Sequence, residues 1–181
     1  KVYSQAADAT GLAVIEAENY GRKAAGINGY EWELNTGAAG YLGTGAMMVS
    51  AGGKNYGVDY DVQSPRMDYF IDFAKTGDHW VWVRAHGANP NADSYHLGDD
   101  MHASGWGYYQ AWGTWNIYHW MKKGPFTVDS TGVHTINLWM REDGTRIDRL
   151  LVTSDNGYVP TAQTDGQGNV IGNGPAESTS V

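Results

Sequence analysis

Two glutamates, Glu16 and Glu18, stand two residues apart in the segment 11–20, which reads GLAVIEAENY. The alternation of apolar and polar residues predicts a β-strand there, and residues two apart on a strand project from the same face. Two carboxylates about 7 Å apart suit a hard cation such as calcium, which takes several oxygen ligands. The alternative is a pair of solvated carboxylates on an edge strand, and the spacing alone favours that reading at least as much.

Tryptophan and tyrosine supply a second candidate chemistry. The chain has 8 Trp and 12 Tyr but only 3 Phe, so most of its aromatic rings carry a polar atom and suit half-wet surfaces. A sugar ring offers an apolar C–H face and hydroxyls, so it is bound by a flat ring with amides, carboxylates or guanidinium groups nearby. Four tryptophans fall within residues 87–120, namely Trp106, Trp112, Trp115 and Trp120.

Each of these rings also has a packing role to consider. Trp80, Trp82 and Trp139 lie within predicted strands, where packing in the core or under a loop is the favoured role. For the loop tryptophans, binding and burial as a hydrophobic anchor are equally good readings. Those loop residues are Trp32, Trp112 and Trp115.

The overall composition excludes several classes of partner. The formal net charge is −8, so no basic surface is expected to attract nucleic acid or an anionic membrane. No run of about 18 apolar residues is present, and there is no cysteine for a disulfide or thiolate site. The 25 glycines favour many tight turns over long helices.

Period-two patterns predict an all-β fold. Residues 67–73 and 79–85 alternate clearly, with Met67 to Phe73 placing their odd-numbered apolar residues toward the core. We expect a β-sandwich (jelly roll) of two antiparallel sheets with long Gly- and Trp-rich loops, residues 21–45 being the first such loop. The Asp-Gly turn at 143–144 predicts a hairpin between the last two strands. Further strands are expected at residues 46–50, 95–97, 126–128, 134–140 and 146–153.

The end of the chain differs in composition from the rest. Residues 1–160 are expected to form the folded module. Residues 161–181 are rich in Thr, Gln, Gly, Asn and Ser and predict a linker or tail. A linker would imply a neighbouring domain.

Two motifs, one near each end of the predicted module, resemble those of a known protein family. Residues 15–20, IEAENY, and residues 132–138, GVHTINL, followed by 146–151, RIDRLL, resemble the opening and closing strands of carbohydrate-binding modules of families 6 and 35. The resemblance implies a structural calcium ion held by Glu16, Glu18 and Asp148. It also implies a sugar site in the loops at one end of the sandwich. The candidates that it gives are Tyr30, Trp32, Tyr41, Trp112, Trp115 and Arg146, to which Asp99, just before the Trp-dense segment, is added.

Arg146 stands where those families usually have an asparagine. A guanidinium group makes paired, charge-assisted hydrogen bonds to planar anions, so it favours a sugar with a carboxylate or sulfate. The alternative is an ion pair of Arg146 with Glu142 or Asp143 across the turn.

The resemblance implies a secreted, extracellular, monomeric binding module that is not an enzyme. Its ligand would be an algal or plant cell-wall polysaccharide, and its partner a tethered glycoside hydrolase or lyase. Two alternatives stay open: a small β-sandwich glycanase or polysaccharide lyase, and a structural or adhesive domain of a surface protein. A lyase needs a base such as His or Tyr, for which His96, His102, His119 and Tyr118 are candidates. Against an enzyme, the sequence contains no Gly-x-Ser-x-Gly, His-Glu-x-x-His or Walker motif.

Overall fold

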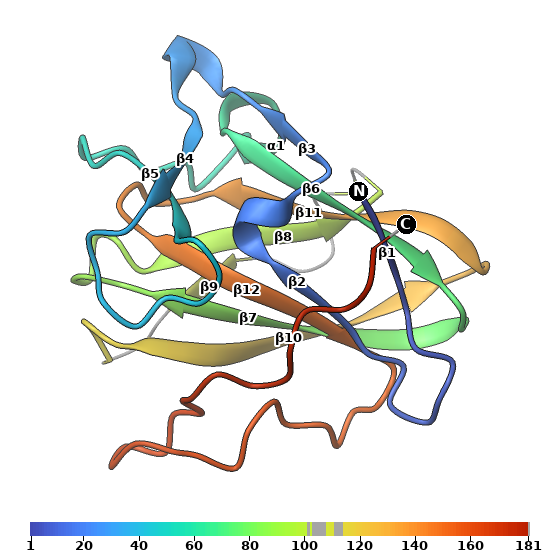
Figure 1. The fold of residues 1–181 in the computed structure, drawn as a ribbon. Coiled ribbons are helices and arrows are strands. Elements are labelled where there is room, and N and C mark those ends of the chain that lie inside the picture. The colour runs from blue at the N-terminus through green and yellow to red at the C-terminus, as the bar shows by residue number, and fades with distance from the viewer. Residues whose placement is uncertain (101, 103–107, 111–113, 181) are drawn as a thin grey trace.

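The computed structural model describes residues 1–100, 102, 108–110 and 114–180. Its strands form two six-stranded sheets packed face to face, with the hydrophobic core between them (Figure 1). Sheet A has the order β1-β6-β11-β8-β9, with β3 also pairing β6. Its strands are β1 (Val2–Ser4), β3 (Arg22–Ala24), β6 (Arg66–Phe73), β8 (Ser94–Asp99), β9 (Tyr108–Gln110) and β11 (Gly132–Met140).

Sheet B has the order β10-β7-β12-β5-β4, with β2 also pairing β12. Its strands are β2 (Ala13–Glu16), β4 (Trp32–Asn35), β5 (Ala46–Val49), β7 (Gly77–His86), β10 (Tyr118–Val128) and β12 (Arg146–Thr153). The described part of the chain also has three short helical turns, η1 (Ala17–Asn19), η2 (Ile27–Gly29) and α1 (Tyr60–Gln63). Every strand pair among the described residues is antiparallel except β1 with β6, so the predicted β-sandwich is confirmed.

The alternating patterns place their apolar residues as expected. On β6, Met67 and Ile71 are fully buried in the core, as are Tyr69 and Phe73. On β7, Val81 and Val83 face the same core, whereas Trp82 packs on the outer face of sheet B. Side chains alternate between faces of a strand, so one short pattern on β7 fills the core and also builds an outer surface.

Two sequence-based expectations were wrong. The turn at 142–144 does not close a hairpin, because β11 lies in sheet A and β12 in sheet B. The chain crosses between the sheets there, since each strand finds its partners elsewhere along the chain. Residues 21–45 are not simply a loop, because they contain β3 and β4, and β4 is a paired strand of sheet B.

The region predicted as a linker or tail packs against the domain. Residues 169–180, which we call the C-terminal strap, run past the edge of β10 and over β2 to the first strand (Figure 1). Val170 O accepts the Trp120 N–H at 2.7 Å, and Ser178 N–H donates to Val14 O at 2.8 Å. Tyr3 and Ser180 form an isolated bridge. The strap therefore covers part of the outer face of sheet B.

No helix among the described residues is long and apolar enough to cross a membrane.

Candidate functional site

The candidate site lies at one end of the sandwich, where β7 and β11 end and β10 and β12 begin. We call this end the rim. A row of cross-strand neighbours borders it on the outer face of sheet B: the register pairs Tyr118 with His86, His86 with Arg146, and Arg146 with Met48. Directly opposed residues of neighbouring strands project on the same side of the sheet, so their side chains gather.

We call the first group of side chains the Arg146 cluster; its members are Asn35, Tyr41, His86, Tyr118 and Arg146. Arg146 Nε donates to Asn35 Oδ1 at 3.0 Å, and the rings of His86 and Tyr118 lie 5.0 Å apart. Tyr41 and Arg146 are half-buried, whereas His86 and Tyr118 are buried.

Electrostatics tie the members of the Arg146 cluster together. Burial raises the pKa of the Tyr118 hydroxyl to about 12, with smaller effects from Asp148, Arg146 and Tyr41. Burial lowers the pKa of His86, and the positive charge of Arg146 lowers it further. His86 is therefore neutral at pH 7, and Arg146 is the charged member that faces solvent.

The terminal nitrogens of Arg146 have no partner among the described residues, since only its Nε makes a hydrogen bond. The predicted alternative of an ion pair across the turn is wrong. Glu142 pairs with Arg141 at 3.0 Å, and Asp143 accepts the backbone N–H groups of Gly52 and Lys54.

The second group of side chains at the rim is the Asp93 cluster, made of Asp93, Ser94, Trp115, Arg141 and Glu142. Ser94 Oγ donates to Glu142 Oε2 at 2.5 Å, and Arg141 Nη1 donates to Ser94 Oγ at 2.8 Å. Trp115 donates its indole N–H to Asp93 Oδ2 at 3.3 Å while its side chain is 40% exposed. Burial, with the neighbouring Glu142 charge, raises the pKa of Asp93 to about 6.

Trp115 borders a surface hollow of about 540 Å³, whose other wall is formed by residues 165–167. Thr114 Oγ1 donates to Gln167 Oε1 at 2.9 Å and joins the two walls. The segment predicted as a linker or tail therefore lines the hollow beside an exposed indole ring.

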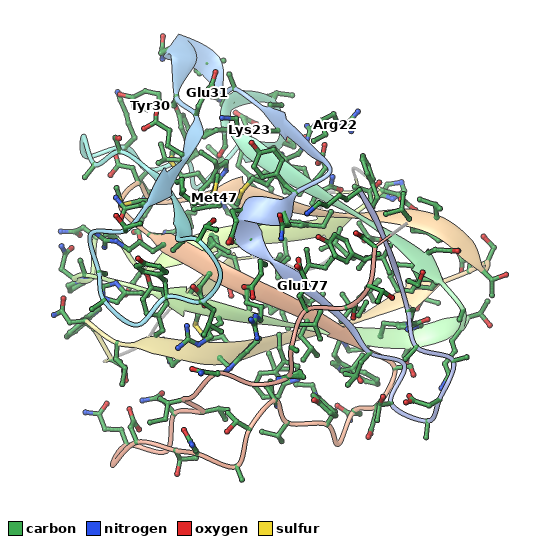
Figure 2. The ribbon with its side chains drawn as sticks, in the orientation of Figure 1. Arg22, Lys23, Tyr30, Glu31, Met47 and Glu177 are labelled. Atoms are coloured by element: carbon green, nitrogen blue, oxygen red, sulfur yellow. The ribbon has the colours of Figure 1, made fainter. Side chains whose placement is uncertain are left out.

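The structure separates the other predicted sugar-binding residues. Trp32 is fully buried in the core and donates its indole N–H to Pro65 O at 3.0 Å, so the prediction of a sugar contact there was wrong. Tyr30 is half-buried near the rim, with Lys54 Nζ 5.9 Å from its ring centre (Figure 2). Asp99 ends β8, five residues from Ser94 at the rim, and borders a different hollow with His134, so it does not join the site. Trp112 lies outside the described residues.

Sequence reasoning missed His86, and it considered Tyr118 only as a base for the lyase alternative. The alternation that placed Trp82 and Arg84 on the outer face of β7 continues to His86, so that pattern could have identified His86. No pattern placed Tyr118 beside Arg146, because the sequence did not predict that β10 begins there.

The three predicted calcium ligands all lie against residues 42–44. A Cβ placed on Gly43 would be 3.1 Å from the carboxyl carbon of Glu18 and 3.4 Å from that of Glu16. The Leu42 N–H donates to Asp148 Oδ1 at 2.7 Å. Glu18 is not on the strand with Glu16, because the chain turns into η1 at Ala17.

These carboxylates are occupied by hydrogen-bond donors. Arg149 contacts both oxygens of Glu16, and Arg84 Nη1 lies 2.6 Å from Asp148 Oδ2. Within the described part of the chain, no group of three or more His, Asp or Glu side chains could hold a metal ion. As arranged, Glu16, Glu18 and Asp148 do not fit the oxygen shell that calcium requires.

The fold has the architecture of carbohydrate-binding modules of families 6 and 35. It is similar to the GH26-CBM35 β-(1,4)-mannanase of Podospora anserina, with a TM-score of 0.58 at 17% identity over 82% of this chain and 29% of that one. It is similar to the C-terminal CBM6 of LamC, a marine laminarinase from Zobellia galactanivorans, with a TM-score of 0.51 at 18% identity over 79% of this chain and 99% of that one. The CBM35 of Paenibacillus barcinonensis gives a TM-score of 0.54 at 16% identity, covering 79% and 99% of the two chains.

The chain belongs to the family of the glycosyl hydrolase family 115 C-terminal domain, whose model matches residues 7–162. It is also 27% identical, over 109 residues, to an uncharacterized protein of Formosa agariphila. That alignment covers 52% of this chain and 26% of the relative, so the chain spans about a quarter of the relative's length.

Proposed function

We propose that this domain binds a polysaccharide at its rim without cleaving it, and that it holds a covalently attached glycoside hydrolase close to its substrate. The observation that carries the proposal is Arg146, half-exposed at the rim and with its terminal guanidinium nitrogens unpartnered among the described residues. A surface arginine fixed through Nε alone presents a ready hydrogen-bonding edge to a ligand.

Aromatic rings provide the apolar side of such a site. Tyr41 is half-buried in the same cluster, and Trp115 is 40% exposed beside the hollow at residues 165–167. Because the Trp115 indole is held by Asp93, its ring loses little rotational freedom when a sugar stacks on it.

The free guanidinium edge favours a polysaccharide that carries carboxylate or sulfate groups. Two oxygens of a carboxylate or sulfate group can accept charge-assisted hydrogen bonds from two guanidinium N–H groups at once, whereas a hydroxyl carries no charge and offers one oxygen. The formal net charge of −8 opposes the approach of a polyanion at low salt, so recognition depends on the local charge of Arg146.

The similar structures support the tethered arrangement. The Podospora protein is a mannanase with a CBM35, and the Zobellia module is the C-terminal CBM6 of a laminarinase. A tether raises the effective concentration of an enzyme near its polymer and needs no new contact. We place the domain in a secreted, extracellular enzyme that acts on algal or plant cell-wall polysaccharides, with the domain itself monomeric.

Affinity gel electrophoresis tests the proposal. The domain is run through gels containing neutral or acidic plant and algal polysaccharides, beside the Trp115→Ala and Arg146→Met variants. We expect at least one acidic polysaccharide to retard the domain, and both variants to migrate faster in that gel. If no polysaccharide in the panel retards the folded domain, the proposal fails and a structural or adhesive role gains support.

The same panel of polysaccharides tests whether the domain cleaves its ligand. Asp93 and Glu142 are neighbouring carboxyl groups, and glycoside hydrolysis uses such a pair. Both are buried, at 5% and 6% exposed, and Glu142 accepts hydrogen bonds from Ser94, Arg141 and Asn55. A catalytic pair has to flank a cleft that admits the glycosidic bond, so we expect no release of reducing ends or unsaturated products.

A further inference from the structure

Buried arginines occupy the place where the family resemblance predicted calcium. Arg84 and Arg149 lie on the outer face of sheet B and are 4% and 7% exposed. Each contacts one of the predicted ligands, Arg84 with Asp148 and Arg149 with Glu16. We propose that these two arginines replace a bound cation and clamp β2, β7 and β12 together, so that the domain is stable without calcium.

The donors around the carboxylates have the wrong polarity for a cation. Thr44 donates both its backbone N–H and its hydroxyl to Glu18 Oε1, at 2.6 and 3.0 Å. Leu42 donates its N–H to Asp148 Oδ1. A calcium site needs oxygen atoms directed at the ion, whereas this segment directs N–H groups at the carboxylates.

Five of the six carboxylate oxygens are engaged in this way. Arg149 contacts both oxygens of Glu16, Arg84 and Leu42 take one oxygen each of Asp148, and Thr44 takes one of Glu18. Glu18 Oε2 is buried without a partner among the described residues. One free oxygen falls far short of the six to eight that calcium takes.

The balance of charges around the three carboxylates also disfavours a bound calcium ion. The three carboxylates contribute three negative charges, and the two guanidinium groups already balance two of them. A divalent cation would add two positive charges beside buried arginines, which are always protonated. Removing either arginine would therefore make the carboxylates more attractive to calcium.

A bulge in β12 makes this arrangement possible. The register with β7 shifts between Ile147 and Arg149, so Asp148 has no paired position and Arg149 lies opposite Arg84. Because a bulge re-aims side chains locally, two consecutive residues can both serve the clamp on one side of the sheet.

The arginines also fasten the C-terminal strap. Arg149 Nη1 donates to Asn173 O at 3.2 Å and to Pro175 O at 2.5 Å. Arg84 Nε donates to Gly172 O at 3.0 Å, and its Nη1 donates to Gly40 O at 3.1 Å. Each guanidinium group thus joins a strand, a carboxylate and the strap.

Metal content and melting temperature of the unaltered domain provide the first test. After gel filtration in metal-free buffer, we expect elemental analysis to find no stoichiometric calcium. We also expect the same melting temperature in excess EDTA and in millimolar calcium. A ligand that binds only the native state must raise the melting temperature, so one retained calcium per chain, or a rise of several degrees with calcium, overturns the proposal.

The second test uses the double variant Arg84→Met/Arg149→Met, with Arg22→Met as the matched control. Arg22 pairs with Asp68 on sheet A and is 55% exposed at its side chain. We expect the double variant to melt at a lower temperature and to regain part of the loss in millimolar calcium, whereas the control shows neither change. A double variant that melts like the unaltered domain overturns the proposal. If the double variant fails to fold, the metal content and the calcium response of the unaltered domain still test whether the domain is stable without calcium.

Discussion

Trp115 donates its indole N–H to Asp93 Oδ2 at 3.3 Å, and Asp93 is also the carboxyl group beside Glu142. The residue that orients the most exposed described tryptophan of the rim therefore has a pKa of about 6. Burial of the Asp93 carboxyl group is the main cause of the raised pKa, whereas the hydrogen bond from Trp115 lowers it, so we expect stability at this end of the sandwich to depend on pH.

The first prediction concerns the pH dependence of stability. The folded-state pKa of Asp93, about 6, lies above its ordinary value of 3.8, so between these values the folded protein binds more protons than the unfolded one. The contribution of Asp93 to stability therefore grows as the pH falls from about 6 to about 4. Asp93→Asn removes the buried charge and keeps an oxygen for Trp115, so it should stabilise the domain by about 1 kcal/mol at pH 7.5 and by nothing at pH 4.

Thermal melts at the two pH values measure this difference. Arg141 and Glu142 face the same carboxyl group, so their charges are left unaltered. Asp129→Asn, an exposed position away from the rim, serves as the control. If Asp93→Asn raised the melting temperature equally at both pH values, the charge of Asp93 would not be the cause of the stabilisation.

The second prediction separates a buried from an exposed tryptophan. Trp32→Ala should destabilise the domain by about 3–5 kcal/mol, because it empties a fully buried core position. Trp115→Ala should cost less than about 1 kcal/mol but remove most of the retardation in polysaccharide gels. Denaturant unfolding and gel mobility are measured together, with Trp32→Phe as a milder core variant. Loss of binding in folded Trp32→Phe and normal binding in Trp115→Ala would reverse the assignment.

The third prediction concerns Arg146. Arg146→Met should weaken binding to an acidic polysaccharide by roughly tenfold or more, since a hydrogen bond to a charged group contributes about 1.5–3 kcal/mol. Arg22→Met is the control, since its guanidinium group pairs with Asp68 on sheet A. If both variants lost the same amount of binding affinity, the loss would follow from the change in net charge, and not from the position of Arg146.

The fourth prediction tests the C-terminal strap through Glu177, which lies where the strap crosses β2 (Figure 2). Its Oε1 accepts hydrogen bonds from the Tyr3 hydroxyl, the Glu16 N–H and the Asn19 amide at 2.8–3.0 Å. Glu177→Ala should therefore destabilise the domain by about 1–3 kcal/mol and speed proteolysis of the strap.

Glu31→Ala is the matched control for Glu177. Glu31 pairs with Lys23 at 3.0 Å but is 47% exposed, so its loss should cost less than about 1 kcal/mol. Equal melting temperatures for the two variants would mean that the strap adds nothing to stability.

Local sequence patterns were enough to predict the class of fold. The alternation on β6 and β7 identified both the strands and their core faces, because side-chain direction along a strand has a fixed period of two. The same patterns correctly assigned Trp82 and Trp139 to packing, at 7% and 0% exposed. The IEAENY and RIDRLL motifs also identified two segments that meet, since β2 pairs with β12.

What the sequence by itself determined was the all-β class and the direction in which the side chains of the alternating strands β6 and β7 face. Only the tertiary structure decided that Trp32 is buried while Trp115 is exposed, that residues 142–144 cross between sheets, and that residues 169–180 pack on sheet B. It also decided that Arg84 and Arg149 take the oxygens of Asp148 and Glu16. The physical reason is the separation along the chain. The direction of a side chain on a strand depends on its near neighbours in the sequence, whereas an ion pair between residues 16 and 149 depends on how distant strands are brought together.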